Sequence, residues 1–105
     1  MAMTIFWTDF AKAALKDIFV YHKDKAGARA SIKLLEQVVK STEVLVHHPL
    51  LGAKEELLSD RIEDFRYLIF RNYKVIYWLN QKYSRVEIID VFDTRQNPLK
   101  LKKHR

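Results

Sequence analysis

The pair of alternating apolar runs FRYLIFR and KVIYWLN, at residues 65–71 and 74–80, restricts the fold more than any other part of the sequence. Side chains of a strand alternate between two faces, so two such runs separated by Asn72 and Tyr73 predict an antiparallel hairpin. A third run, RVEIIDVF at residues 85–92, follows a second polar turn. Three strands with short connections predict an antiparallel meander.

The first half of the chain has a different period. TIFWT at residues 4–8 predicts a short strand, and Thr8 is suited to cap a helix. Apolar residues then recur at three- and four-residue steps, which predicts two helices that each bury one stripe. The expected stripes are Phe10, Ala13, Ala14, Ile18 and Tyr21, and then Ala28, Ile32, Leu35, Val39, Thr42 and Val46. Gly27 separates the helices, and His48 ends the second because it precedes a proline.

The resulting order, β-α-α-β-β-β, predicts an α+β fold in which a helical hairpin packs on a small antiparallel sheet. A chain of 105 residues buries one core, so we expect a single domain over residues 1–105 with a basic tail at 99–105. No apolar run approaches the roughly 20 residues that span a bilayer, and cysteine is absent. We therefore expect a cytoplasmic protein that does not contact membranes.

The two faces of the predicted hairpin differ in composition. Even-length loops place Arg66, Leu68, Phe70, Val75, Tyr77 and Leu79 on one face, which we expect to pack on the helices. The other face carries Tyr67, Ile69, Arg71, Lys74, Ile76 and Trp78. This mixture is suited either to stacking on bases and holding phosphates or to cover by a partner. We favour a covered face, because Trp78, Ile69 and Ile76 would otherwise expose a large apolar patch.

Familiar catalytic motifs are missing from the sequence. Only Gly27 and Gly52 are present, so there is no glycine-rich phosphate loop, and no serine has a nucleophile-elbow context. Strand parity would place Glu87 and Asp93 on one face and Asp90 on the other, so we expect structural roles for these acids. We predict neither a metal nor a cofactor.

Positive charge is concentrated at the C-terminal end. The chain carries a net charge of +6, and residues 95–105 hold Arg95, Lys100, Lys102, Lys103 and Arg105 without any acid. Such a segment suits a polyanion or an acidic protein partner, but a solvated tail has the same composition. Charge alone leaves both interpretations open.

The order of the elements, together with HHPLLG, FRYLIFRNYKVIYWLN and VFDTRQNP, resembles the RelE/ParE superfamily of type II toxin–antitoxin modules, which includes plasmid stabilisation proteins. The resemblance covers roughly residues 3–99. It implies a basic toxin that inhibits growth and is silenced by a cognate antitoxin. The antitoxin would carry the DNA-binding domain, so the toxin would reach operator DNA only indirectly.

The superfamily contains two activities. RelE-like members cut messenger RNA on the ribosome without a metal, and ParE-like members poison DNA gyrase. Lys74 matches the arginine that RelE-like nucleases place on the phosphate, and Arg95 lies within a residue or two of their catalytic arginine. Tyr67 and Ile69 stand where those nucleases carry lysines. Their tyrosine falls near Leu99 and Lys100, for which His104 substitutes only if the tail folds back.

RNA cleavage at a 2′-hydroxyl needs a group that takes the proton, and the chain offers cations without an obvious base. Arg66 and Arg95, by contrast, resemble positions that ParE-like members share. The leading hypothesis is therefore a ParE-like toxin that acts by binding, with gyrase as the implied target. The alternatives are a ribosome-dependent mRNA endoribonuclease, with Arg95, Lys74 and Arg66 as candidate catalytic residues, and an inactive relic that only binds its antitoxin.

The expected sites are as follows. The target-binding candidates are Arg66, Arg71, Lys74 and Arg95, and the antitoxin-binding candidates are Trp78 and Ile69. We hypothesise that Arg66 and Arg95 stand at the ends of one cationic rim that includes Lys74, because an arginine fork holds phosphate or carboxylate at two points. The structural alternative is that Arg66 and Asp93 tie the sheet together.

Overall fold

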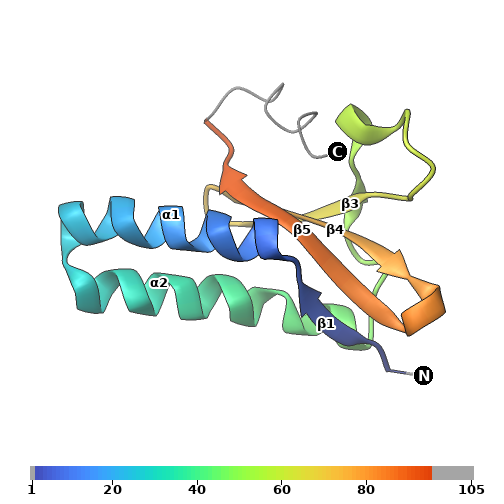
Figure 1. The fold of residues 1–105 in the computed structure, drawn as a ribbon, viewed down its shortest axis with the longest axis horizontal. Coiled ribbons are helices and arrows are strands. Elements are labelled where there is room, and N and C mark those ends of the chain that lie inside the picture. Colours follow the sequence, from blue (N-terminus) through green and yellow to red (C-terminus); the bar gives the residue numbers. More distant parts are fainter. Residues whose placement is uncertain (1, 96–105) are drawn as a thin grey trace.

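The computed structural model describes residues 2–95 and has a helical hairpin on one face of a five-stranded sheet (Figure 1). The helices are α1 (Asp9–Ala26) and α2 (Ala28–Ser41), and the strands are β1 (Thr4–Trp7), β2 (Ala53–Lys54), β3 (Arg66–Phe70), β4 (Tyr73–Asn80) and β5 (Arg85–Asp93). Three 3₁₀ turns lie between them: η1 (Glu43–Val46), η2 (Glu56–Leu58) and η3 (Gln81–Tyr83). The predicted α+β class and the hairpin of helices are confirmed.

The sheet has the strand order β1-β5-β4-β3-β2. The antiparallel meander β3-β4-β5 is as predicted. The sheet is mixed, because β1 runs parallel to β5, and it gains the two-residue strand β2, which pairs with β3. Neither addition has a sequence signal, since β1 meets a partner at the far end of the chain and Ala53–Lys54 is too short to alternate.

The two helices begin and end where local chemistry directs them at three of four boundaries. The Thr8 hydroxyl accepts a hydrogen bond from the Ala11 amide at 3.2 Å and donates to the Ile88 carbonyl at 2.9 Å. Gly27, at φ 92°, joins α1 to α2, a conformation that favours glycine. The predicted stop of α2 at His48 is wrong: α2 ends at Ser41, because the hydroxyls of Ser41 and Thr42 bond carbonyls of the preceding turn and the chain tightens into η1.

The buried stripe of α2 differs from the predicted one. Ser31, Leu34 and Val38 are buried, whereas Ile32 and Val39 are exposed. The apolar spacing of α2 fits two adjacent stripes, and the stripe that packs on α1 is the one that contains the small polar residue Ser31. The Ser31 hydroxyl donates to the Phe19 carbonyl of α1 at 2.8 Å, so its burial costs little and the helices approach closely.

The α1 stripe is also only partly buried. Ala11 is the fully buried residue of this helix, and Ala14 and Ile18 pack against the core from its margin. Phe10 and Tyr21, expected inside, are 50% and 55% exposed. The stripe therefore faces outward over much of its length and forms one wall of the groove described below.

The main core lies between the helices and the sheet. The predicted helix-facing side chains of the hairpin are there, namely Leu68, Phe70, Val75, Tyr77 and Leu79. A second, smaller core of Leu58, Phe65 and Ile76 covers the other face, with Tyr67 and Trp78 packed at its edge. The chain's own segment 55–65 thus covers part of a face that we expected a partner to cover, while Ile69 remains 55% exposed.

A β-bulge changes the parity of β5. Ile76 pairs with Asp90 while Tyr77 pairs with Ile88, so one extra residue, Ile89, enters β5. An inserted residue moves everything beyond it to the opposite face. Glu87 and Asp90 therefore share the helix-free face and Asp93 lies on the other, which makes the predicted grouping of these acids wrong.

No helix within residues 2–95 combines the length and apolar character needed to cross a membrane. No three His, Asp or Glu side chains in that range converge in a way that would hold a metal ion.

Candidate functional site

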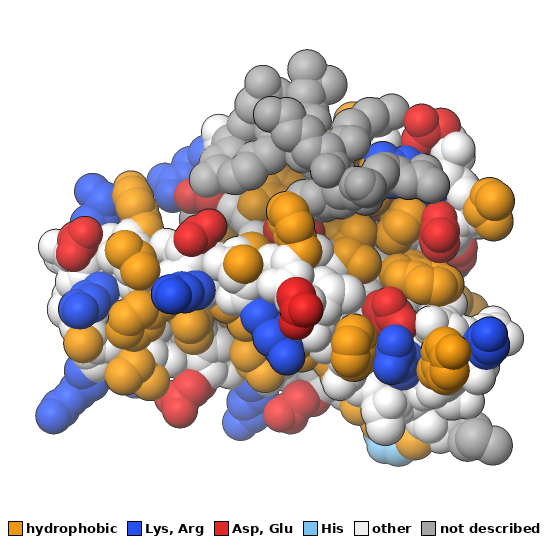
Figure 2. Space-filling view, in the orientation of Figure 1, with side chains coloured by type: hydrophobic (Ala, Val, Ile, Leu, Met, Phe, Trp, Pro, Cys, Tyr) orange, Lys and Arg blue, Asp and Glu red, His pale blue; other side chains and the backbone are white. Residues whose placement is uncertain are grey.

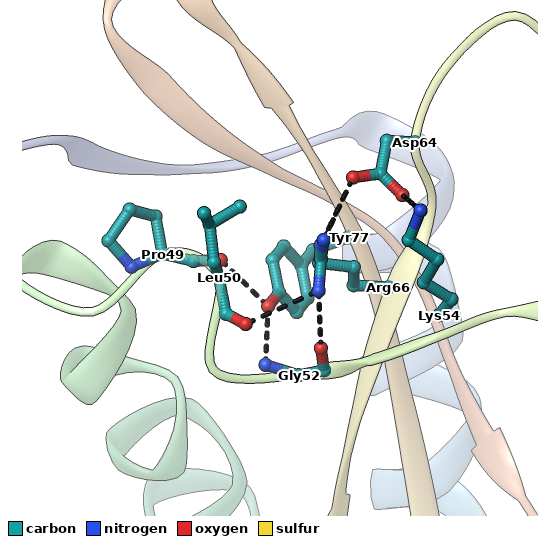
Figure 3. Close-up of polar contacts among 7 residues, drawn as sticks. All are labelled: Pro49, Leu50, Gly52, Lys54, Asp64, Arg66 and Tyr77. Atoms are coloured by element: carbon teal, nitrogen blue, oxygen red, sulfur yellow. Dashed lines mark hydrogen bonds and ion pairs between the residues drawn. The ribbon is translucent and has the colours of Figure 1, made fainter.

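Arg66 is held inside a hydrogen-bonded corner of the structure (Figure 3). One terminal nitrogen donates to the Gly52 and Leu50 carbonyls at 3.0 and 3.3 Å. The Nε and the other terminal nitrogen face the Asp64 carboxylate at 3.2 and 3.1 Å. With a side chain only 16% exposed, this cation fastens the segment before β2 to the sheet.

Tyr77 completes the same corner. Its hydroxyl accepts from the Gly52 amide at 2.9 Å and donates to the Pro49 carbonyl at 2.8 Å. A Cβ added to Gly52 would lie 2.6 Å from the Tyr67 carbonyl oxygen and 2.6 Å from the Tyr77 hydroxyl. The glycine of the HHPLLG stretch is thus needed for close approach of the chain to the sheet.

Lys74 is likewise engaged within the domain. Its Nζ lies 2.6 Å from Oε1 of Glu55, whose side chain is buried, and 4.1 Å from the centre of the Tyr67 ring. Glu55 also caps η2 by accepting from the Leu57 amide at 3.2 Å. The positive charge of Lys74 is therefore balanced by a carboxylate that has no other ion-pair partner among residues 2–95.

Arg95 occupies a different environment at the end of β5. Its backbone amide and its Nε each lie 2.9 Å from Oδ1 of Asp93, and a terminal nitrogen also pairs with that carboxylate. These hydrogen bonds hold the pKa of Asp93 well below its usual range, despite partial burial. The Arg95 side chain is 73% exposed, so its outer surface is open to a partner.

The strand register separates Arg66 from Arg95. Arg66 pairs with Tyr77, near the end of β4, whereas Asp93 pairs with Tyr73 at its start. The hypothesised single rim is therefore not formed, and neither is the Arg66–Asp93 tie, because each residue has a different charged partner. Arg71 lies at the Arg95 end instead, with φ 55° in the β3–β4 turn, where the Thr94 amide donates to the Asn72 carbonyl at 2.8 Å. Lys74, which pairs with Phe92, lies at that end too.

A groove of about 660 Å³ lies between α1 and the last part of β5. Its apolar wall is the outward stripe of α1, with Phe10, Ile18 and Tyr21. Its other wall is β5 from Asp90 to Asp93, with Arg95 at the end. Since β1 pairs with β5 only as far as Ile88, no strand within residues 2–95 covers the later part of β5 on that side.

Tyr73, which lines the groove, forms a polar pair that the sequence did not indicate. Nε2 of His22 lies 2.5 Å from the hydroxyl of Tyr73, and Tyr73 contributes to the groove wall. Burial, followed by the nearby Asp93 charge, raises the pKa of Tyr73. The two residues are far apart in sequence and belong to a helix and a strand, so no local spacing connects them.

The predicted antitoxin-binding residues lie on the opposite face. Trp78 packs edge-on against Phe65 with ring centres 6.5 Å apart, and Ile69 lies farther along the same face, opposite Lys74, with 55% of its surface exposed. Leu99, Lys100, His104 and the rest of the basic tail lie outside the described residues. Their predicted roles therefore stay predictions.

These features define a class of protein: a small basic α+β domain with a groove beside α1 and exposed arginines at one end of its sheet. The chain belongs to the family of ParE toxins of type II toxin–antitoxin systems, parDE, whose model matches residues 5–98. No curated protein matches the sequence.

Two solved structures are similar in fold. A chain of the chromosomal ParDE toxin–antitoxin system from P. aeruginosa superposes with a TM-score of 0.72 at 18% identity, covering 88% of this chain and 96% of that one. A chain of the toxin–antitoxin complex RelBE2 from Mycobacterium tuberculosis gives a TM-score of 0.61 at 18% identity, covering 89% and 99%. At these identities the likeness establishes the fold.

Proposed function

We propose that this protein is the toxin of a type II toxin–antitoxin module, that it arrests growth by binding DNA gyrase, and that a cognate antitoxin silences it. The observation that carries the proposal is the α1–β5 groove in a chain of the ParE toxin family. The groove combines exposed Phe10 and Tyr21 with a stretch of β5 that lacks a neighbouring strand among residues 2–95. Such a surface is suited to an amphipathic or extended segment of a partner protein.

Action by binding is supported by the state of the groups that a nuclease would use. Lys74, the counterpart of a phosphate-binding arginine in RelE-like members, is paired with the buried Glu55. Tyr67 and Ile69 replace lysines. The raised pKa of Tyr73 is unfavourable for a base at neutral pH, and its side chain is buried. The described part of the chain thus favours a gyrase-binding toxin over an RNA-cleaving one.

Arg95 is the residue we expect to contact the target. It is exposed, it is oriented by Asp93, and it stands at the same end of the sheet as Arg71. Arg95→Ala should abolish growth arrest while leaving folding and antitoxin binding intact. Lys33→Ala, a change at an exposed lysine of α2, is the matched control and should remain toxic. A folded Arg95→Ala protein with full toxicity would remove this residue from the target site.

The target is tested with two parallel readouts. Purified toxin should inhibit supercoiling by gyrase in vitro, and its induction in cells should produce DNA damage before any cleavage of messenger RNA detectable by primer extension. Ribosome-dependent cleavage with unaffected gyrase would favour the RelE-like alternative. Neither effect, with antitoxin binding retained, would identify an inactive relic.

Lys74 needs a compensated variant, because Lys74→Ala alone leaves the buried Glu55 unpaired and costs about 3 kcal/mol or more. The double variant Lys74→Met with Glu55→Gln removes both charges and keeps the shape. A gyrase-binding toxin should keep its activity in this background. Loss of toxicity in a stably folded double variant would restore Lys74 to the functional site.

A further inference from the structure

A row of aromatic rings and cations lies at the start of β5, at the opposite end of this strand from the groove. The guanidinium carbon of Arg85 is 3.9 Å from the centre of the Phe6 ring and 5.0 Å from that of Tyr83. The Nζ of Lys82 is 5.4 Å from the Tyr83 ring. Figure 2 shows hydrophobic and basic side chains alternating over the corner where β1 meets the β4–β5 turn.

The Arg85 guanidinium is fixed in place, but some of its hydrogen-bond donors are unused within residues 2–95. Its Nε donates to Oε2 of Glu87 at 2.8 Å, and the same oxygen accepts from the Asn80 amide at 2.7 Å. The terminal NH1 and NH2 groups make no hydrogen bond within residues 2–95. A guanidinium held by a carboxylate and two rings is preorganised, and its free fork matches the geometry of a phosphate.

The surroundings favour a ligand that has a flat ring as well as a negative charge. Tyr83 is 58% exposed and Phe6 is 39% exposed, so each ring has surface left after contact with Arg85. Lys82, Arg85 and Glu87 together carry a net charge of only +1, so an acidic peptide would gain little here from charge alone. Stacking on an exposed ring adds affinity for a base whatever its sequence.

We propose that Phe6, Lys82, Tyr83 and Arg85 form a binding site for a nucleotide unit, presented by single-stranded nucleic acid. The phosphate lies against the Arg85 fork and Lys82, and the base stacks on the free surface of Tyr83 or Phe6. This site is separate from the Arg95 end of the sheet. The inference goes beyond the proposed function and does not rest on it, because no feature of the groove or of Arg95 enters it.

The test is a titration of the full-length, ¹⁵N-labelled chain with thymidine monophosphate and with a twelve-residue oligothymidylate, followed by NMR. Amide shifts should concentrate at residues 81–85 and at Phe6 and its neighbours. Tighter binding of the oligonucleotide would identify a nucleic acid as the source. Equal affinity per site would identify a free nucleotide as the ligand, with the same phosphate and base contacts. Shifts confined to the basic residues 96–105 would overturn the proposal.

Variants then separate stacking from charge. Tyr83→Ser should weaken oligothymidylate binding about fivefold or more, measured by fluorescence polarisation, because a stacked ring is lost. Arg85→Lys keeps the charge but loses the fork, and should also weaken binding. Lys82→Gln should reduce the slope of log Kd against log salt by about 0.7, as expected for one phosphate contact, and by more than Lys33→Gln does.

Two outcomes would contradict the site even if binding is observed. Unchanged affinity in both Tyr83→Ser and Arg85→Lys would show that neither the ring nor the fork is used. Equal binding of a polyglutamate peptide, with the same sensitivity to these variants, would assign the corner to acidic proteins. Circular dichroism melts of each variant ensure that lost binding does not reflect lost folding, and Tyr83→Ser is at an exposed position.

Discussion

Each end of the sheet carries an arginine that the sequence indicates as a candidate site residue, and the two arginines differ in exposure and in their hydrogen-bond partners. At one end Arg66 is almost enclosed and bonds two backbone carbonyls and Asp64. At the other end Arg95 is largely exposed and bonds one carboxylate, that of Asp93 at the end of β5. A cation whose N–H groups donate to main-chain carbonyls stabilises the fold. A cation that bonds only one carboxylate still has an exposed surface that a partner can contact.

This comparison predicts that even one added methyl group at the Arg66 end lowers the stability of the protein. Gly52→Ala should lower the free energy of unfolding by about 3 kcal/mol, because the new Cβ meets a backbone carbonyl and the Tyr77 ring, which have no room to shift. A thermal melt should show a fall of about 12 °C or more. The neighbouring Ala53→Ser, at an exposed position, should have little effect. A wild-type melting temperature for Gly52→Ala would show that this corner opens in solution.

Tyr77→Phe tests the same corner without adding an atom. It removes the hydroxyl that links the buried Gly52 amide to the partly buried Pro49 carbonyl and leaves both groups without this partner. We expect a loss of about 2 kcal/mol in urea unfolding. Tyr83→Phe, at an exposed tyrosine, is the matched control and should stay within about 0.5 kcal/mol of wild type.

A matched pair of substitutions compares the two arginines directly. Arg66→Met should destabilise the protein by about 1–2 kcal/mol, since the Gly52 and Leu50 carbonyls lose a charged donor. Arg95→Met should leave the free energy of unfolding almost unchanged, because its ion pair is exposed. Urea midpoints measured under one set of conditions decide the order. Equal losses would mean that the Arg95 end also supports the fold.

The smallest predicted effect is a pH dependence of the free energy of unfolding, caused by Asp93 at the Arg95 end of the sheet. The pKa of Asp93 is lowered in the folded protein, so its contribution is fully present above the unfolded value of about 4 and declines as the pH falls below it. In Arg95→Ala this pKa moves back toward its usual range, and stability should fall less between pH 5 and pH 3 than in wild type. Parallel pH profiles for the two proteins would contradict the assignment of Asp93 to Arg95.

Much of the fold could be predicted because it depends on local patterns. The β3–β4 hairpin, the face shared by Val75 and Tyr77, the Thr8 cap and the Gly27 corner all follow from spacing over a few residues. Predictions failed where two choices had similar local patterns. The stripe of α2 was misplaced because Ser31 is buried by a bond to Phe19, and the acids of β5 were misgrouped because one bulged residue reverses parity.

The candidate site was less predictable than the fold. The sequence indicated Arg95 and Arg71 as cations, and the structure brings them to one end of the sheet. The sequence did not indicate that Glu55 balances the charge of Lys74, that Asp64 and Gly52 hold Arg66, or that His22 contacts Tyr73. These contacts join residues from different elements, and whether a cation is available to a ligand depends on them.

By itself, the sequence determined the kind and order of the main elements and the basic character of the chain, since hydrophobic period, capping residues and charge act over short distances. The tertiary structure alone decided that β1 lies parallel to β5 and ends early enough to leave a groove beside α1. It also decided which arginine is enclosed and which is open. The physical reason is that burial and hydrogen-bond partners are set by segments far apart in the chain, whose meeting no local pattern encodes.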